Sequence, residues 1–233
     1  MDYLIKAKNL TKKYGIRTVI NNIDFEIRKG EKLALIGTNG AGKSTTISML
    51  LGMIKPDYGT IKYWCNNYNA KIGVQLQATP FFEGYTAKEN LYFFASLYNQ
   101  TLSNEDIKTI LENCNLYEVR NTLASRLSIG QQKRLSIAVT TLHSPELIVL
   151  DEPTAGLDPK ARYEIKKLID SLSKKGITVL FSSHDLDEVW NISDRLVFLH
   201  QGNVVADGNP KELLEKFNVS NLEELYLILT ESK

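Results

Sequence analysis

The chain has 233 residues, of which 43% are apolar and 24% charged, and its formal net charge is +1. This composition is typical of a globular protein with one large domain, and it excludes a fibrous or disordered chain. A net charge this close to zero gives no bulk attraction to nucleic acid. The two cysteines, Cys65 and Cys114, are too few for a disulfide framework and lack the paired spacing of a zinc site.

No stretch of the sequence predicts a membrane segment. The first residues mix charged and apolar side chains, so they lack the apolar core of a secretion signal. The longest run without a charged residue, 90–104, is shorter than the roughly 18 apolar residues that a membrane helix needs. We expect a cytoplasmic protein, and any membrane-spanning partner has to be a separate chain.

The first third of the chain predicts short strands around a glycine-rich turn. Strands are expected at 4–8, 23–27 and 32–36, and the last runs directly into the glycines. The apolar spacing of 44–53 predicts a helix, which the turn after Lys55-Pro56 ends. Further short strands are expected at 61–64 and 72–75.

The middle of the chain changes to helical periodicity. Thr86 and Glu89 have the spacing of a capping box and open a helix rich in aromatic residues. The segment 103–115 has apolar residues at helical spacing, and another helix is expected after Gly130.

After Pro145 the β pattern returns. The apolar run 147–150 is typical of a parallel strand covered on both faces. A helix at 160–174, a strand at 177–181, and strands at 196–199 and 204–205 complete the pattern. Strands alternating with helices predict an α/β fold.

The segment that follows the strand 32–36 fits the GxxxxGK[ST] phosphate-binding pattern in its required context, between a strand and a helix. Glycines let backbone amides close around phosphate oxygens, Lys43 reaches the outer phosphates, and the Ser44 hydroxyl can bind magnesium. The residues expected to hold the nucleotide are Gly37, Thr38, Asn39, Gly40, Ala41, Gly42, Lys43, Ser44 and Thr45.

Two acids follow the strand 147–150. Asp151 lies at the carboxyl end of that strand, the edge where α/β sheets bind ligands, and is the candidate for the metal. Glu152 is the candidate general base for the attacking water. Two adjacent acids could also only cap the next turn, and the phosphate loop makes the catalytic interpretation the stronger one.

The segment Leu127–Arg134, with the sequence LSIGQQKR, resembles the signature of ABC-type ATPases, and it precedes the Asp-Glu strand as in that family. The resemblance covers nearly the whole chain. It implies a single domain, 1–233, with a P-loop NTPase (RecA-like) core at about 1–76 and 137–210 and an antiparallel β subdomain. The inserted α-helical subdomain would lie at about 77–136, and a C-terminal helical tail at about 211–233.

The resemblance also implies roles for single residues. Tyr14 would stack on adenine, Gln77 would contact magnesium and the attacking water, and His184 would act near the γ-phosphate. The implied catalytic residues are Lys43, Gln77, Glu152 and His184, and the implied magnesium ligands are Ser44, Gln77 and Asp151. In this family the signature faces the nucleotide of the other subunit, which assigns Ser128, Gly130, Gln131 and Asp158 to that contact. The expected cofactors are ATP and Mg²⁺, and hydrolysis implies a dimer that ATP holds together, of identical or paralogous subunits.

The favoured function is the ATPase subunit of a membrane transporter, peripheral on the inner face of the cell membrane. A separate permease would dock on the helical subdomain, where Tyr92, Phe93 and Phe94 are either the docking surface or partly core. The segment 221–230 resembles the end of bacterial drug and antibiotic exporter subunits, which favours export, although it could be only a packing helix.

The alternative function is a soluble ABC-type ATPase that acts on the ribosome or nucleic acid. Repair ATPases of that class carry long coiled coils, and this chain has no such heptads. Translation factors carry two ATPase units, and this chain has one. A regulator that binds nucleotide without hydrolysis is disfavoured because Glu152 and His184 are both present. The sequence does not specify the cargo.

Overall fold

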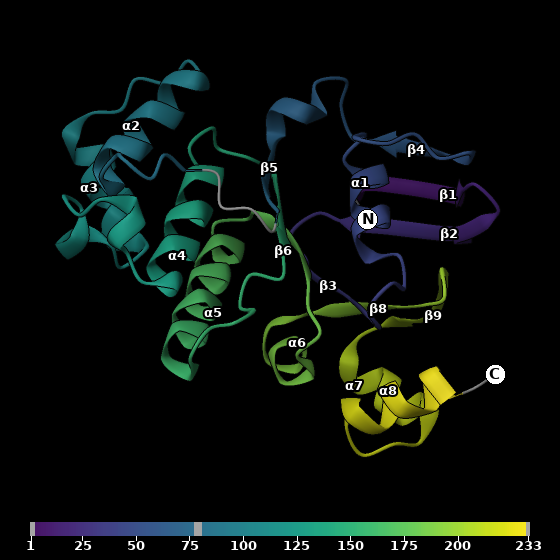
Figure 1. Cartoon of the computed structure of the whole chain (residues 1–233). Helices are drawn as coiled ribbons and strands as arrows, with labels where there is room; N and C mark the ends of the chain where they lie inside the picture. Colours follow the sequence, from purple (N-terminus) through teal and green to yellow (C-terminus); the bar gives the residue numbers. More distant parts are fainter. Residues whose placement is uncertain (1–2, 77–80, 232–233) are drawn as a thin grey trace. The chain divides into compact units, whose positions relative to one another are not determined.

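The computed structural model describes residues 3–76 and 81–231. The chain divides into two compact units, and Figure 1 shows the elements of each. Unit 1 takes in residues 1–69 and 178–233, and unit 2 takes in residues 70–177. These two units are not the subdomains expected from the sequence, whose boundaries at about 76, 136 and 210 stay a prediction.

Unit 1 contains a three-stranded antiparallel sheet with the order β2-β1-β4. Its strands are β1 (Tyr3–Tyr14), β2 (Arg17–Arg28) and β4 (Tyr58–Tyr63). The strands β1 and β2 form a hairpin because Gly15 takes a positive φ of 58° between them. The buried residues Ile23, Phe25 and Ile27 alternate along β2, so one face of the sheet is apolar. The predicted strands 4–8 and 23–27 are confirmed and are longer than expected.

A second sheet in unit 1 has the order β7-β3-β8-β9. Its strands are β3 (Lys32–Gly37), β7 (Thr178–Ser182), β8 (Arg195–His200) and β9 (Asn203–Gly208). The strands β7, β3 and β8 are parallel, and β9 is antiparallel to β8. All residues of β7 are buried, as expected for a parallel strand covered on both faces.

Four helices complete unit 1: α1 (Lys43–Leu50), α6 (Leu186–Ile192), α7 (Pro210–Phe217) and α8 (Leu222–Glu231). Helix α8 packs against both α6 and α7, and the yellow helices α7 and α8 lie together near the C-terminus in Figure 1. Sequence reasoning missed α6, because seven residues are too few for a helical period to be recognised.

The described residues of unit 2, which are 70–76 and 81–177, form two parallel strands and four α-helices. The strands β5 (Ile72–Gln75) and β6 (Leu147–Asp151) pair directly. The helices are α2 (Ala87–Leu97), α3 (Asn104–Asn113), α4 (Ile129–Thr140) and α5 (Pro159–Lys174), with short 3-10 turns η1 (Tyr68–Lys71), η2 (Tyr117–Val119) and η3 (Ala124–Arg126) nearby in the chain. The capping box predicted at Thr86 and Glu89 is confirmed.

The expected α/β fold with an antiparallel sheet and a run of helices is therefore present. Neither cysteine forms a disulfide. Within residues 3–76 and 81–231, every helix is too short or too polar to cross a membrane.

Candidate functional site

The phosphate loop of unit 1 runs from the end of β3 to the start of α1, and glycines set its path. Gly37, Gly40 and Gly42 take positive φ angles of 152°, 75° and 107°. A Cβ on Gly37 would lie 2.2 Å from the Leu199 carbonyl oxygen, and one on Gly42 would lie 2.4 Å from Ile20 Cδ1. A Cβ at 37 would require the backbone of β8 to move, whereas a Cβ at 42 would displace the Ile20 side chain and would also be strained by the positive φ.

Lys43 and the amino end of helix α1 give this loop its positive charge. The Lys43 side chain is buried, and its Nζ donates to the carbonyl oxygens of Gly37 at 2.8 Å and Thr38 at 3.3 Å. The first turn of α1 holds no acidic residue, so nothing there offsets the positive end of the helix dipole. The Ser44 hydroxyl lies in that turn on an exposed residue. The arrangement favours an anion such as a phosphate group.

Two further predicted residues lie in unit 1. Tyr14 ends β1 with half of its surface exposed, and Lys12 Nζ lies 5.7 Å from its ring centroid. His184 follows β7 and is exposed. Because β3 and β7 are parallel neighbours, with Leu35 paired to Ser182, the phosphate loop and His184 emerge at the same edge of this sheet.

The turn that carries His184 is held by hydrogen bonds on both sides. Ser183 Oγ accepts the Asp185 backbone N–H at 3.0 Å and donates to the buried carboxylate of Glu188. Asp185 caps α6 by accepting the Glu188 N–H at 3.0 Å. His184 therefore projects from a turn whose backbone is fixed at both neighbouring residues.

In unit 2, strand β6 ends on the two predicted acids. Asp151 is buried, and Glu152 has a positive φ of 49°, which is uncommon for a residue with a side chain. Lys133 Nζ of α4 donates to the Glu152 carbonyl oxygen at 3.3 Å. Burial lowers the pKa of Lys133, whereas the nearby carboxylates of Asp151 and Glu152 act to raise it. A cation thus accompanies the two acids.

The signature residues and Asp158 lie together in unit 2. Ser128 caps α4: its Oγ accepts the Gln131 N–H, and Gln131 Oε1 accepts the Ser128 N–H at 2.9 Å. Asp158 caps α5 by accepting the Ala161 N–H at 3.0 Å. A Cβ on Gly130 would lie 2.8 Å from Ala161 Cβ, so the first turns of α4 and α5 are in close contact. Both helix starts line one cavity of about 320 Å³.

Sequence reasoning missed an ion pair between two charged residues that line this cavity. The guanidinium of Arg134 on α4 is buried and forms an ion pair with Glu164 on α5. Asn115 Nδ2 donates to the other oxygen of Glu164 at 3.2 Å. The signal was an acid at the same helical spacing as the buried residues Ala161, Ile165 and Leu168 of α5, because a charge on a buried stripe needs a partner.

One predicted residue, Gln77, lies outside the described residues. The nearby Gln75 is fully buried on β5 and donates to the Leu76 carbonyl oxygen. In the described part of the chain, no three His, Cys, Asp or Glu side chains form a ready metal site. Serine, carboxylate and amide oxygens remain the hard ligands that suit Mg²⁺.

The ABC transporter family model matches residues 20–155, which is more than half of the chain. The chain belongs to the ABC transporter family. It is 34% identical over 246 residues to the linearmycin resistance ATP-binding protein LnrL of Bacillus subtilis, covering 98% of this chain and 79% of that protein. It is 37% identical to the bacitracin transport ATP-binding protein BcrA of Enterococcus faecalis, covering 91% and 71%. The lantibiotic transport ATP-binding protein SrtF of Streptococcus pyogenes is 34% identical over 96% of both chains.

Solved structures agree with this assignment. An ATP-binding subunit of an ABC transporter superimposes with a TM-score of 0.83 at 29% identity, covering 97% of this chain and 99% of that one. A dimeric ATP-binding cassette in a post-hydrolysis state with ADP and phosphate superimposes with a TM-score of 0.76 at 26% identity, covering 88% and 98%. The P-loop NTPase fold expected from the sequence is confirmed. This ABC protein is the ATP-binding and ATP-hydrolysing subunit of a transporter.

Proposed function

We propose that this ABC ATPase powers export, and that the residues identified in the two units carry out its hydrolysis step. The fixed phosphate loop with Lys43 supports binding of the β- and γ-phosphates, and the exposed Tyr14 ring suits stacking on adenine. Mg²⁺ would be held by Ser44 and Asp151 with Gln77, and when bound it neutralises charge on the phosphates.

Glu152 is the general base of this proposal. It takes a proton from the attacking water while Lys43 stabilises the negative charge of the γ-phosphoryl group. His184 donates from its fixed turn toward the same phosphate group. The observation that carries the assignment is that β6 ends on a buried Asp151 and that Glu152, the next residue, has a positive φ of 49°, a strained conformation that is common at functional sites.

The cavity at the starts of α4 and α5 is proposed to face the nucleotide of the second subunit. Ser128, Gly130 and Gln131 supply donors there, and Asp158 borders them. Two helix starts near one cavity favour negative charge, which suits a γ-phosphate from the other subunit. Hydrolysis then needs two chains, identical or paralogous.

The permease is proposed to dock on an aromatic cluster of unit 2, made by Phe82, Tyr85, Phe93 and Phe94. The centroids of Phe82 and Phe93 lie 4.6 Å apart, and Phe82 and Tyr85 are exposed by nearly half. The buried Asn90 fixes the loop that carries them, because its side chain bonds the Phe82 N–H at 2.7 Å and the carbonyl oxygens of Phe82, Tyr85 and Thr86. A rigid, exposed aromatic surface is typical of a protein interface.

Export is favoured over import because the relatives LnrL, BcrA and SrtF are named for antibiotic resistance or antibiotic transport. The alternative, action on the ribosome or nucleic acid, is disfavoured because a net charge of +1 gives no bulk attraction to nucleic acid. The proposed location is the inner face of the cell membrane, through the permease.

The test is a detergent pull-down of tagged Glu152→Gln protein with ATP from its native cells. Recovery of a polytopic membrane protein supports the transporter, and its loss in a Phe82→Ser and Tyr85→Ser variant supports the docking surface. Tyr163→Ser is the matched control, since Tyr163 is an exposed aromatic residue of α5 outside the cluster. Recovery of ribosomes or nucleic acid without a membrane protein would overturn the proposal.

A further inference from the structure

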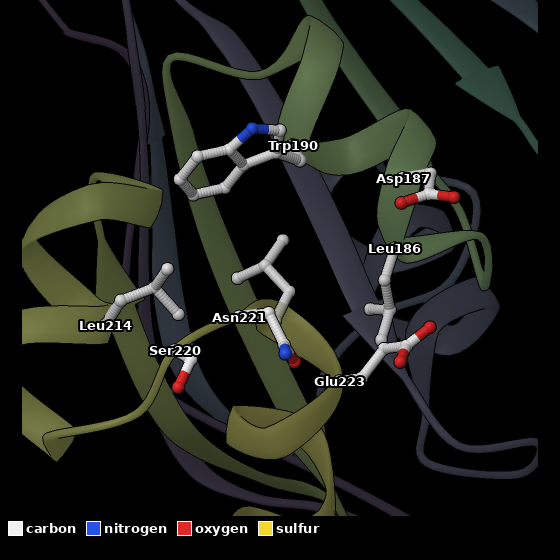
Figure 2. Close-up of a pocket in the computed structure, with 8 residues that line it drawn as sticks. Leu186, Asp187, Trp190, Leu214, Ser220, Asn221 and Glu223 are labelled. Carbon is white, nitrogen blue, oxygen red and sulfur yellow. The ribbon is translucent and has the colours of Figure 1, made fainter.

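Helices α6, α7 and α8 of unit 1 surround a second hollow, of about 410 Å³, that contains none of the nucleotide or signature residues. Figure 2 shows Leu186, Asp187 and Trp190 of α6 on one side of it and Leu214 of α7 on another, with the residues around the start of α8 closing the third side. We call this space the α6–α8 pocket. Its volume is within the range of small-ligand sites.

One wall of the α6–α8 pocket is apolar. Trp190 is 42% exposed, and Leu214 and Leu222 line the same pocket. Helix α8 is packed against the rest of unit 1, because Leu222 and Leu225 are buried and the centroid of the Tyr226 ring lies 5.3 Å from that of Phe198. The pocket therefore offers an indole surface to a ligand from a fixed frame.

The rim of the α6–α8 pocket is acidic. Asp187 comes from α6 and Glu223 from α8, and both are exposed. Within the described residues, neither carboxylate forms an ion pair or a side-chain hydrogen bond, and the lining includes no lysine or arginine. Two carboxylates beside an indole match a cation carried on an apolar stem, because a guanidinium stacks on tryptophan and binds carboxylates at its edge.

We propose that the α6–α8 pocket binds an arginine side chain from a basic cytoplasmic segment of the permease. The source of the arginine rests on the proposed function, whereas the chemistry of the pocket does not. Cytoplasmic segments next to membrane helices are rich in lysine and arginine, which is complementary to the unpaired acids of the rim. Arginine fits better than lysine because its planar group can contact the indole face and a carboxylate together.

Helix α6 lines the α6–α8 pocket and also begins next to the His184 turn. This helix starts two residues after His184, and Asp185 and Glu188 tie its first turn to the His184 turn. An arginine that bridges Asp187 and Glu223 restrains α6 against α8.

The binding test uses Trp190 as the reporter. The chain has two tryptophans, so Trp64→Phe leaves Trp190 alone. The probe is the peptide acetyl-Leu-Arg-Arg-Leu-amide, and its matched control carries citrulline, which has the same shape without the charge. We expect a saturable change in Trp190 fluorescence with the arginine peptide and about tenfold weaker binding of the citrulline peptide. Calorimetric titration of the unmodified chain gives the same comparison without the Trp64 substitution.

The double variant Asp187→Asn with Glu223→Gln is expected to bind the arginine peptide about tenfold more weakly than the unmodified chain does. Glu212→Gln with Glu215→Gln removes two exposed acids of α7 that do not line the pocket, and it should leave binding unchanged. If both double variants weakened binding of the arginine peptide equally, the overall negative charge of the protein would explain the binding, and the site would be overturned. Equal affinity for the citrulline and arginine peptides would also overturn it, because the pocket would then not recognise the guanidinium charge. The same double variant, Asp187→Asn with Glu223→Gln, is then used in the pull-down. If it loses peptide binding but still recovers the permease, the permease is not the source of the arginine. Neither peptide measurement needs hydrolysis, so failure of the transporter proposal is seen separately.

Discussion

The two units contribute different kinds of functional structure. In unit 1 the phosphate loop is made by the backbone: Gly37 lies so close to the Leu199 carbonyl oxygen that no side chain fits, and the loop carbonyls accept hydrogen bonds from Lys43. In unit 2 the chemistry is on side chains: Asp151 and Glu152 extend from the end of β6, and Ser128 and Gln131 cap α4. Substitutions in the loop should therefore damage the fold, and substitutions at the acids should damage only the reaction.

The largest expected effect is on hydrolysis, in unit 2. Glu152→Gln removes the proposed general base but keeps the size and most hydrogen bonds of the side chain, so the ATPase rate should fall about 10²- to 10⁴-fold. Nucleotide affinity and the urea midpoint of unfolding should stay close to those of the unmodified protein. The measurement is steady-state phosphate release together with binding of a fluorescent ATP analogue.

The control for that experiment is Glu105→Gln, which removes an exposed acid from the first turn of α3. Its ATPase rate should be unchanged. A Glu152→Gln variant that loses nucleotide binding as much as hydrolysis would show that Glu152 supports the structure of the site and is not the base.

The next effect is on stability, in unit 1. Gly37→Ala forces a Cβ to within 2.2 Å of the Leu199 carbonyl oxygen, which belongs to the neighbouring strand β8. We expect the free energy of unfolding to fall on the order of 4 kcal/mol, because a backbone atom cannot move aside as a side-chain tip does. Gly40→Ala is the matched change, since a Cβ there has no neighbour closer than 3.9 Å and only the positive φ to resist it. Its expected cost is about 1 kcal/mol. If urea unfolding gave the same loss of stability for Gly37→Ala and Gly40→Ala, the close backbone contact at Gly37 would not determine the stability of the loop.

A smaller effect is expected behind the signature cavity. Arg134→Met leaves Glu164 with only Asn115, and breaking a buried pair on one side costs about 3 kcal/mol where one partner is partly exposed. Arg134→Met combined with Glu164→Gln should recover much of this loss, because no charge is then left unpaired. Urea unfolding of the single and double variants measures the difference. A single variant as stable as the unmodified chain would show that the pair does not hold α4 to α5.

Much of this could be predicted from the sequence because it depends on local patterns. The strand before Gly37, the capping box at Thr86 and the buried run that ends at Asp151 are each set by residues near one another in the chain. The order of these elements, with the signature between them, was enough to indicate the family.

The parts that could not be predicted depend on residues distant in the chain. The pair Arg134–Glu164 joins two helices, and the α6–α8 pocket needs α6 and α8 side by side. No local period reports such a contact, and α6 itself is too short to show one. The roles of the individual site residues stay predictions, since Gln77 lies outside the described residues and the phosphate loop and the acids belong to different units.

The smallest expected effect is a pH dependence confined to unit 1. Burial raises the pKa of Glu31, although the Arg28 N–H at 2.7 Å and Arg195 act to lower it. The pKa of the partner Arg195 is also raised: burial lowers it, but Asp207, bound through both oxygens, and Glu31 outweigh the burial. Arg195 has two carboxylate partners, which together favour its charged form more than burial disfavours it. Glu31 has less compensation, so burial still disfavours its charged form.

The sign of the effect follows from proton binding. Folded Glu31 holds its proton to a higher pH than the unfolded chain, so its contribution to stability is complete below the ordinary glutamate pKa and is lost as pH rises through the folded pKa. The free energy of unfolding of the unmodified chain, minus that of Glu31→Gln, should therefore fall as the pH rises above the ordinary glutamate pKa of 4.5. Glu26 is the opposite case on β2, because its hydrogen bond to Lys6 lowers its pKa. The corresponding difference for Glu26→Gln should rise with pH over the range just below 4.5. Urea unfolding from pH 3.5 to 7 measures both slopes, and slopes of the same sign would show that burial does not govern Glu31.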